Sequence, residues 1–163
     1  MALFVLGDTH LSLGASKPMD IFPGWNDYVE RLEKNWRKLI TPQDTIVLAG
    51  DISWAMRLTD TRKDFAFLQQ LPGQKIIMKG NHDYWWESAG KLNRMDAENN
   101  MQYLYGSTAF LGDKDIAICG THGWVCPGDI HYQEDRDAKP YRRELLRVER
   151  TLQEAEALQC KHT

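Results

Sequence analysis

Short runs of consecutive apolar residues alternate with longer amphipathic segments through the first half of the chain. The runs at 2–6, 45–49 and 75–79 are typical of strands that a parallel sheet buries on both faces. Between these runs, apolar residues recur at close to helical spacing over 25–39 and 59–71, which predicts two helices. Two successive strand–helix–strand units predict a parallel sheet with right-handed crossovers.

The pattern changes in the second half of the chain. A helix is expected near 85–97, and a long helical stretch from about 139 to 160. Between them the sequence predicts short strands, and Gly112-Asp113 is expected to join the last two as a hairpin. These strands are expected around 101–105, 108–111 and 115–119.

The three buried strands all end in a glycine followed by polar residues. In open α/β sheets ligands bind beyond the carboxyl ends of the strands, so the three endings are expected to meet at one edge. Asp8 and His10 are two positions apart in an extended segment and are expected to point to the same side. The endings are Gly7-Asp8-Thr9-His10, Gly50-Asp51 and Gly80-Asn81-His82-Asp83.

Two interpretations of these endings stay open on the residues alone. Gly-Asp and Gly-Asn are common turn sequences, so any single ending is typical of turn or helix-capping chemistry. The repetition of the ending after three successive buried strands favours a shared site. Carboxylate, imidazole and amide groups are ligands for Mn, Fe or Zn, and a carboxylate can bridge two ions that clamp a phosphoryl group.

Composition and charge limit the kinds of partner and the cellular location that the sequence allows. A length of 163 residues fits one domain, and a formal net charge of −3 argues against a surface for nucleic acid or an anionic membrane. With no signal peptide and no apolar stretch of membrane-spanning length, a cytoplasmic location is expected. The three cysteines fit no metal-binding spacing and are expected to be free thiols: Cys119, Cys126 and Cys160.

The order and spacing of these motifs carry a resemblance to a known family. Asp8-x-His10, Gly50-Asp51 and Gly80-Asn81-His82-Asp83 resemble the first three motifs of the calcineurin-like metallophosphoesterase superfamily. The stretch from Gly50 to Met56 also resembles a bacterial branch of predicted phosphohydrolases, and the resemblance covers about residues 1–125. It implies an α/β fold, a metallophosphoesterase-like β-sandwich flanked by helices in an αββα arrangement.

The resemblance also implies a site with two divalent metal ions, for which Mn is the first choice and Fe or Zn the alternatives. Asp8 and His10 would bind one ion, Asp51 would bridge both, and Asn81 would bind the second. His82 would be a catalytic residue that contacts the phosphate and helps to protonate the leaving oxygen. The implied reaction is in-line attack on phosphorus by metal-bound hydroxide, without a phospho-enzyme.

The sequence departs from the superfamily in its later motifs. The family pattern continues with a strand-end histidine and a Gly-His-x-His, and no Gly-His dipeptide occurs in this sequence. Residues 1–163 are therefore expected to form a single metallophosphoesterase-like domain truncated before those motifs, with an incomplete second sheet. Unpaired strands at the edges of that sheet would favour self-association. The second ion would keep only Asp51 and Asn81.

A second departure concerns the group that orients His82. The protein phosphatase branch has an aspartate three residues after the bridging aspartate, and Trp54 stands at that position here. An orienting carboxylate would have to come from elsewhere, and Asp83 is one candidate.

Several residues outside the motifs are candidates for substrate contact. His122 follows an expected strand, and Arg57 lies just past the second motif, where its guanidinium could bind phosphate. Either could instead be an ordinary loop or surface residue. Trp54, Trp85 and Trp86 could form an aromatic wall or pack in the core. The arginines of the last helix alternate with glutamates, which is typical of a solvated, salt-bridged face without a nucleic-acid role.

The sequence thus predicts a metal-dependent phosphoesterase that acts on a phosphate ester. Because the later histidine motifs are absent, a catalytically silent module that binds a metal or a partner is the alternative. A nucleotide-binding module is disfavoured, since no glycine-rich phosphate loop follows any expected strand.

Overall fold

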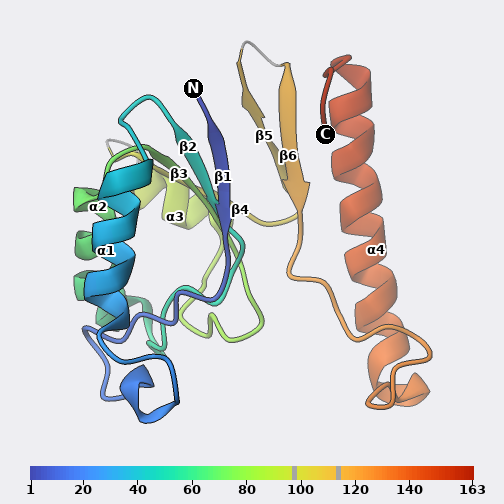
Figure 1. The fold of residues 1–163 in the computed structure, drawn as a ribbon. Coiled ribbons are helices and arrows are strands. Elements are labelled where there is room, and N and C mark those ends of the chain that lie inside the picture. The colour runs from blue at the N-terminus through green and yellow to red at the C-terminus, as the bar shows by residue number, and fades with distance from the viewer. Residues whose placement is uncertain (97–98, 113–114) are drawn as a thin grey trace. The chain divides into compact units, whose positions relative to one another are not determined.

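The computed structural model describes residues 1–96, 99–112 and 115–163 in two compact units, Met1–Tyr103 and Leu104–Thr163 (Figure 1). Each unit is built differently. The first holds a parallel sheet with its helices, and the second holds a two-stranded antiparallel sheet with one long helix.

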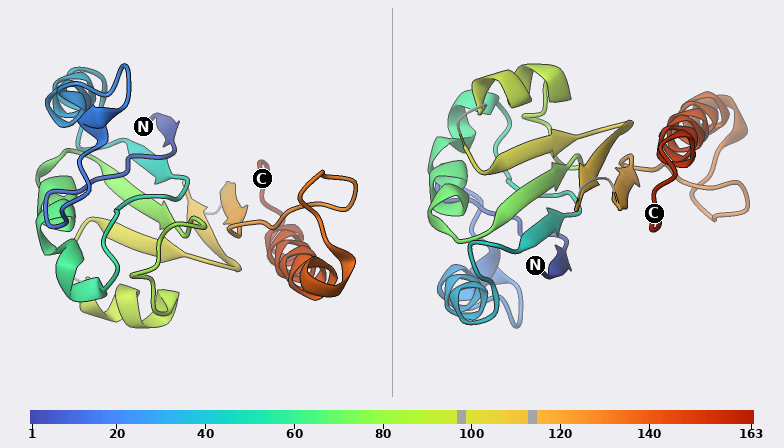
Figure 2. Two further views of the ribbon diagram at one scale, coloured as in Figure 1. Left: turned by 90° about the horizontal axis from the view of Figure 1, so that it is seen from below. Right: turned by 90° about the horizontal axis from the view of Figure 1, so that it is seen from above.

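The sheet of the first unit has four strands in the order β1-β2-β3-β4, which run side by side in Figure 2. Strand β2 is buried at all four positions and β3 at its three central ones, as expected for strands covered on both faces. The edge strand β1 differs from that expectation, because Leu3 and Val5 are exposed. Leu3 pairs with Thr45, and Thr45 with Gln74, in parallel register. The strands are β1 (Leu3–Leu6), β2 (Thr45–Leu48), β3 (Gln74–Met78) and β4 (Met101–Leu104).

Helices α1 and α2 lie on the same side of this sheet (Figure 1). Each buries its apolar stripe: Trp36 of α1 donates its indole N–H to the carbonyl of Pro72, and Leu68 of α2 is fully buried. The helical elements of this unit are η1 (Met19–Ile21), α1 (Tyr28–Leu39), η2 (Leu58–Thr61), α2 (Arg62–Gln70) and α3 (Ala89–Met95).

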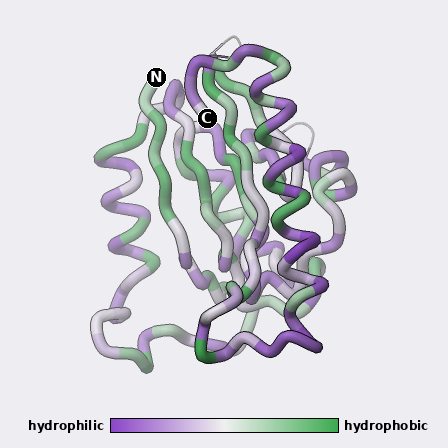
Figure 3. The backbone as a smooth tube through the Cα atoms, turned by 90° about the vertical axis from the view of Figure 1, so that its right-hand side faces the viewer, coloured by the Kyte–Doolittle hydropathy of each residue, from purple (hydrophilic) through white to green (hydrophobic). Residues whose placement is uncertain are grey.

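In the second unit, β5 (Ser107–Leu111) and β6 (Ile116–Gly120) pair antiparallel, as the hairpin pattern predicts. Helix α4 (Glu134–Ala157) contacts both strands and buries Ala155. Polar and apolar stretches alternate along the helices in Figure 3, whereas the strands are predominantly apolar.

Several element boundaries differ from the sequence prediction. Helix α1 begins at Tyr28 rather than near Trp25, because Asp27 adopts a left-handed backbone. Helix α4 begins five residues earlier than expected and includes Pro140, and its first turn is held by Asp137, which accepts the N–H of Gln133. The expected helix over 59–71 divides into η2 and α2.

Two expected positions, Ala97 at the end of a helix and Asp113 in the hairpin, lie outside the described residues. The three cysteines are free, as expected. Over the described ranges, no helix is both long and apolar enough to cross a membrane.

Candidate metal centre

The loops that follow β1 and β2 continue the parallel pairing of their strands. The backbone N–H of Asp8 donates to the carbonyl of Gly50 over 3.2 Å, and that of His10 to the carbonyl of Asp51 over 2.9 Å. The polar residues of the first two motifs therefore meet at one sheet edge, as the strand endings predict.

The side chains of Asp8, His10 and Asp51 converge at this edge. Each offers a ligand atom, and these atoms all lie within 4.8 Å of one another. The His10 Nε2 atom is 3.5 Å from an Asp8 carboxylate oxygen. Two ligand atoms of one zinc-like ion lie at most about 4.4 Å apart, so these atoms need to approach one another by no more than a few tenths of an ångström to share one ion. One imidazole and two carboxylates also match the donors that Mn, Fe and Zn accept, so these residues fit a divalent ion.

The backbone of the same three residues is left-handed. Asp8, His10 and Asp51 have φ angles of 56°, 43° and 52°. Non-glycine residues rarely adopt this conformation, and such local strain collects at functional sites, where the surrounding structure over-determines it. The segment from Asp8 to His10 is therefore not extended, contrary to the sequence expectation, although its two side chains still converge with that of Asp51.

The second and third loops pack against each other without room for additional side-chain atoms. A Cβ atom on Gly80 would lie 2.1 Å from an Asp51 carboxylate oxygen, and one on Gly50 would lie 2.6 Å from the Cα atom of Gly80. Gly50 also has a φ of +102°. These two positions therefore require glycine for close approach of the loops.

His82 binds both oxygens of Asp51. Its backbone N–H donates to Asp51 Oδ1 over 2.9 Å, and its ring Nδ1 lies 2.8 Å from Asp51 Oδ2. Although burial disfavours the charged carboxylate, these hydrogen bonds and the nearby imidazoles outweigh it and lower the pKa of Asp51. Since an ionised carboxylate only accepts, the His82 Nδ1–H is the donor.

The suggestion that Asp83 orients His82 is wrong. The carboxylate of Asp83 is 1% exposed and accepts N–H groups from the backbone of Asp51, Ile52 and Gly80 instead. The carboxylate that contacts the His82 ring is that of Asp51. These two residues are 31 positions apart, so no local sequence pattern could identify them as partners.

Asn81 begins the third loop and is exposed. Its amide nitrogen lies 3.3 Å from His82 Nδ1 and 3.4 Å from His82 Nε2. That Asn81 binds a second ion stays a prediction.

Of the three tryptophans considered for an aromatic wall that faces the substrate, only Trp54 is accessible. Trp85 and Trp86 are buried in the core, at 1% and 8% exposure, which excludes them from a substrate-facing wall. Trp54 is partly exposed and stacks on the imidazole of His10, with ring centroids 4.8 Å apart and an interplanar angle of 18°. Its ring is also 5.5 Å from that of His82. Trp54 therefore packs against both imidazoles of the site.

Further contacts hold the first loop, and sequence reasoning missed them. The hydroxyl of Tyr28 donates to the carbonyl of His10 over 3.0 Å. Asp64 is fully buried, accepts the N–H of Leu13 over 2.7 Å and accepts the hydroxyl of Ser53. Burial raises the pKa of Asp64. The sequence held one sign of these contacts: Asp64 lies on the otherwise apolar face of the expected helix, with Phe65 and Leu68.

The two residues expected to contact substrate are not brought into this cluster by any described contact. Arg57 is exposed at the start of η2. His122 belongs to the second unit, where its ring stacks on Tyr105 with centroids 5.4 Å apart. Their roles stay predictions.

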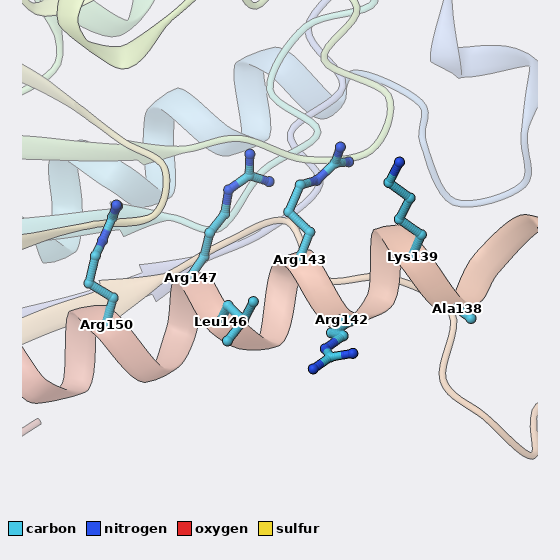
Figure 4. A pocket seen from close by; sticks show the side chains of 7 residues that line it. All are labelled: Ala138, Lys139, Arg142, Arg143, Leu146, Arg147 and Arg150. Carbon is cyan, nitrogen blue, oxygen red and sulfur yellow. The ribbon is translucent and has the colours of Figure 1, made fainter.

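A groove runs along α4 in the second unit. Figure 4 shows Lys139, Arg143, Arg147 and Arg150 projecting from one side of the helix, with Arg142 on the other. Arg143 and Arg147 pair with Glu144, and Arg150 donates to the carbonyl of Gly106. The salt-bridged interpretation therefore holds for Arg143 and Arg147. The groove is lined by cationic and apolar side chains and offers no metal ligand.

Comparison with known proteins adds an independent observation. The model of a family described as calcineurin-like phosphoesterase matches residues 1–159, which include all three loops of the metal centre. Among solved structures, the chain is similar to a protein of unknown function, AQ665 from Aquifex aeolicus, with 19% sequence identity and a TM-score of 0.49. That similarity covers 98% of this chain and 75% of the other. No curated protein matches the chain.

Proposed function

Because the chain belongs to the calcineurin-like phosphoesterase family, we propose that it is a metal-dependent phosphohydrolase that cleaves a phosphate ester. The convergence of Asp8, His10 and Asp51 within 4.8 Å is the observation that carries the proposal. Their carboxylate and imidazole groups give this edge of the sheet the ligands of a hydrolytic metal centre.

Asp8, His10 and Asp51 would hold the first ion, and Asp51 with Asn81 the second, with Mn as the first choice. When bound, divalent ions lower the pKa of water and offset the charge that develops on phosphoryl oxygens. The His82 ring is fixed by two hydrogen bonds to the Asp51 carboxylate, one from the backbone N–H of His82 and one from its ring Nδ1–H. A ring held this way can contact a phosphate oxygen and give a proton to the leaving oxygen. Trp54 fixes the plane of the His10 ring.

The alternative is a module that binds metal and hydrolyses nothing, and one observation favours it. The sequence has no Gly-His dipeptide, so the second ion would keep one carboxylate and one amide as its protein ligands. A displacement of about 1 Å in a reacting group can cost on the order of 100-fold in rate. We therefore expect turnover by this chain to be slow.

Single-turnover hydrolysis of bis-p-nitrophenyl phosphate, with protein in excess and Mn²⁺ present, separates the two proposals. We expect slow release of p-nitrophenolate that needs Mn²⁺ and is lost in Asp51→Asn but kept in Asp60→Asn, an exposed carboxylate control. Saturable Mn²⁺ binding without any release would establish the silent module. Equal release by wild type and Asp51→Asn would contradict the proposed site.

A further inference from the structure

We propose that Asp83 is a positioning residue that locks the loops after β2 and β3 together and so sets the place of Asp51 relative to His82. This inference rests on the proposed function, because its consequence is the geometry of the metal ligands. The name Asp83 clamp is used here for the hydrogen bonds that its carboxylate accepts from Asp51, Ile52 and Gly80.

Each oxygen of the Asp83 clamp has its own donors. Oδ2 accepts the N–H of Gly80 over 2.7 Å and that of Asp51 over 2.9 Å, so one atom joins the two loops directly. Oδ1 accepts the N–H of Ile52 over 2.9 Å and the indole N–H of Trp85, also over 2.9 Å. The N–H of Ser53 lies further away, at 3.4 Å.

The donors explain why a carboxylate is needed at this buried place. Burial opposes the charged form and raises the pKa of Asp83, and the backbone N–H groups of Gly80, Ile52 and Ser53 counteract it. Without this acceptor the buried N–H groups of Asp51 and Ile52, which lie beyond the end of β2, would lose the partner that they have in the structure, and an unsatisfied buried donor is costly. An amide in place of the carboxylate could accept on one side only.

The third loop thus holds Asp51 from two sides. Asp83 binds the Asp51 backbone N–H, while the neighbouring His82 binds both oxygens of the Asp51 side chain. A shift of Asp83 would therefore move the backbone of Asp51 relative to the imidazole that contacts its carboxylate. Such partners of metal ligands typically change metal affinity by about 10–100-fold when mutated.

The test is Mn²⁺ titration of the full chain and of Asp83→Asn, together with the visible absorption spectrum of each protein saturated with Co²⁺. We expect Mn²⁺ affinity to fall by about 10–100-fold and the Co²⁺ spectrum to change even at saturation. A general loss of stability could weaken binding but would leave the spectrum of the loaded site unchanged.

Asp44→Asn is the matched control. Asp44 is likewise a hydrogen-bonded carboxylate, with three donors in the N–H of Ala2 and the N–H and hydroxyl of Thr41, but it lies before β2 at the other end of the sheet. We expect this variant to lose thermal stability and to keep both the Mn²⁺ affinity and the Co²⁺ spectrum.

If Asp83→Asn does not fold, Trp85→Phe is tested in its place. This variant removes only the indole N–H that donates to Asp83 and keeps an aromatic ring in the core. A several-fold loss of Mn²⁺ affinity in that variant supports the proposal. The proposal is overturned if folded Asp83→Asn has the Mn²⁺ affinity and Co²⁺ spectrum of wild type, or if Trp85→Phe does when Asp83→Asn cannot be made. It is also overturned if Asp44→Asn loses as much Mn²⁺ affinity as Asp83→Asn does. Failure of the wild-type chain to bind Mn²⁺ would instead overturn the proposed function, and the role of Asp83 with it.

Discussion

The imidazole Nδ1 of His82 lies 2.8 Å from Oδ2 of Asp51, and this hydrogen bond joins the loop after β3 to the loop after β2. Asp51 is also one of the three residues whose ligand atoms converge at the sheet edge. The proposed proton donor and the proposed bridging ligand are therefore one hydrogen bond apart. Proton donation and metal binding, which are separate steps of the proposed reaction, thus depend on two residues in direct contact.

Replacement of His82 by alanine separates those roles. Because Asp8, His10 and Asp51 keep their ligand atoms but Asp51 loses its hydrogen bond to the ring, we expect His82→Ala to bind Mn²⁺ about 10-fold more weakly and still to be loaded at saturating Mn²⁺, where hydrolysis is measured. Loss of a general acid typically costs about 10²–10⁴-fold, so any single-turnover hydrolysis should disappear. Mn²⁺ titration and p-nitrophenolate release measure the two effects. Hydrolysis at the wild-type rate would show that His82 has no part in the reaction.

Trp54 stacks on the ring of His10, so its truncation should loosen this proposed metal ligand. We expect Trp54→Ala to weaken Mn²⁺ binding by about 2–10-fold, the equivalent of one aromatic pair, and Trp54→Phe to keep most of the affinity. The two variants are compared by calorimetric titration. Identical affinities for alanine and phenylalanine at this position would mean that stacking on His10 does not contribute.

Sequence patterns predicted much of this site, and the reason is local. An apolar run that ends in glycine and a polar residue is visible within four or five positions, so the meeting of Asp8, His10 and Asp51 could be predicted from the parallel topology. The link that Asp83 makes between the second and third loops could not be predicted, because its hydrogen bonds to Asp51 and Ile52 go to backbone N–H groups 32 and 31 positions away and leave no side-chain pattern. For the same reason, stacking of Trp54 on His10 could not be distinguished from core packing or a substrate wall.

The helices and strands were predicted where a repeating pattern determines them, and their ends were missed where a single residue does. Apolar periodicity placed the strands and the centres of the helices. The start of α1 was wrong because Asp27 adopts a left-handed backbone, and the start of α4 was wrong because Asp137 caps a first turn that lies before Pro140. Both boundaries depend on single residues rather than on a repeating pattern.

Lys75 predicts a specific pH dependence of stability. It is fully buried on β3, donates to the carbonyl of Leu71, and burial lowers its pKa from 10.5 to about 8. Below pH 8 both folded and unfolded chains are protonated and the cost of the buried charge is present in full. Between pH 8 and 10.5 the unfolded chain binds more protons than the folded chain, so the free energy of unfolding rises with pH.

Urea unfolding of wild type and Lys75→Met at pH 7 and pH 10 isolates this effect, since other titrating groups cancel in the difference. We expect wild type to gain about 2 kcal/mol relative to Lys75→Met between the two pH values. A difference that does not change with pH would mean that Lys75 titrates in the folded protein as it does in water.

The central claim is that Asp51 belongs to a metal centre, and calorimetric titration with Mn²⁺ tests it most directly. Asp51 is the one proposed ligand that would touch both ions, so Asp51→Asn removes a negative charge from between two cations. We expect it to weaken Mn²⁺ binding more than any other single substitution at Asp8, His10 or Asn81, while the exposed-carboxylate control Asp60→Asn binds as wild type does. Equal Mn²⁺ affinity in wild type and in folded Asp51→Asn would contradict the account.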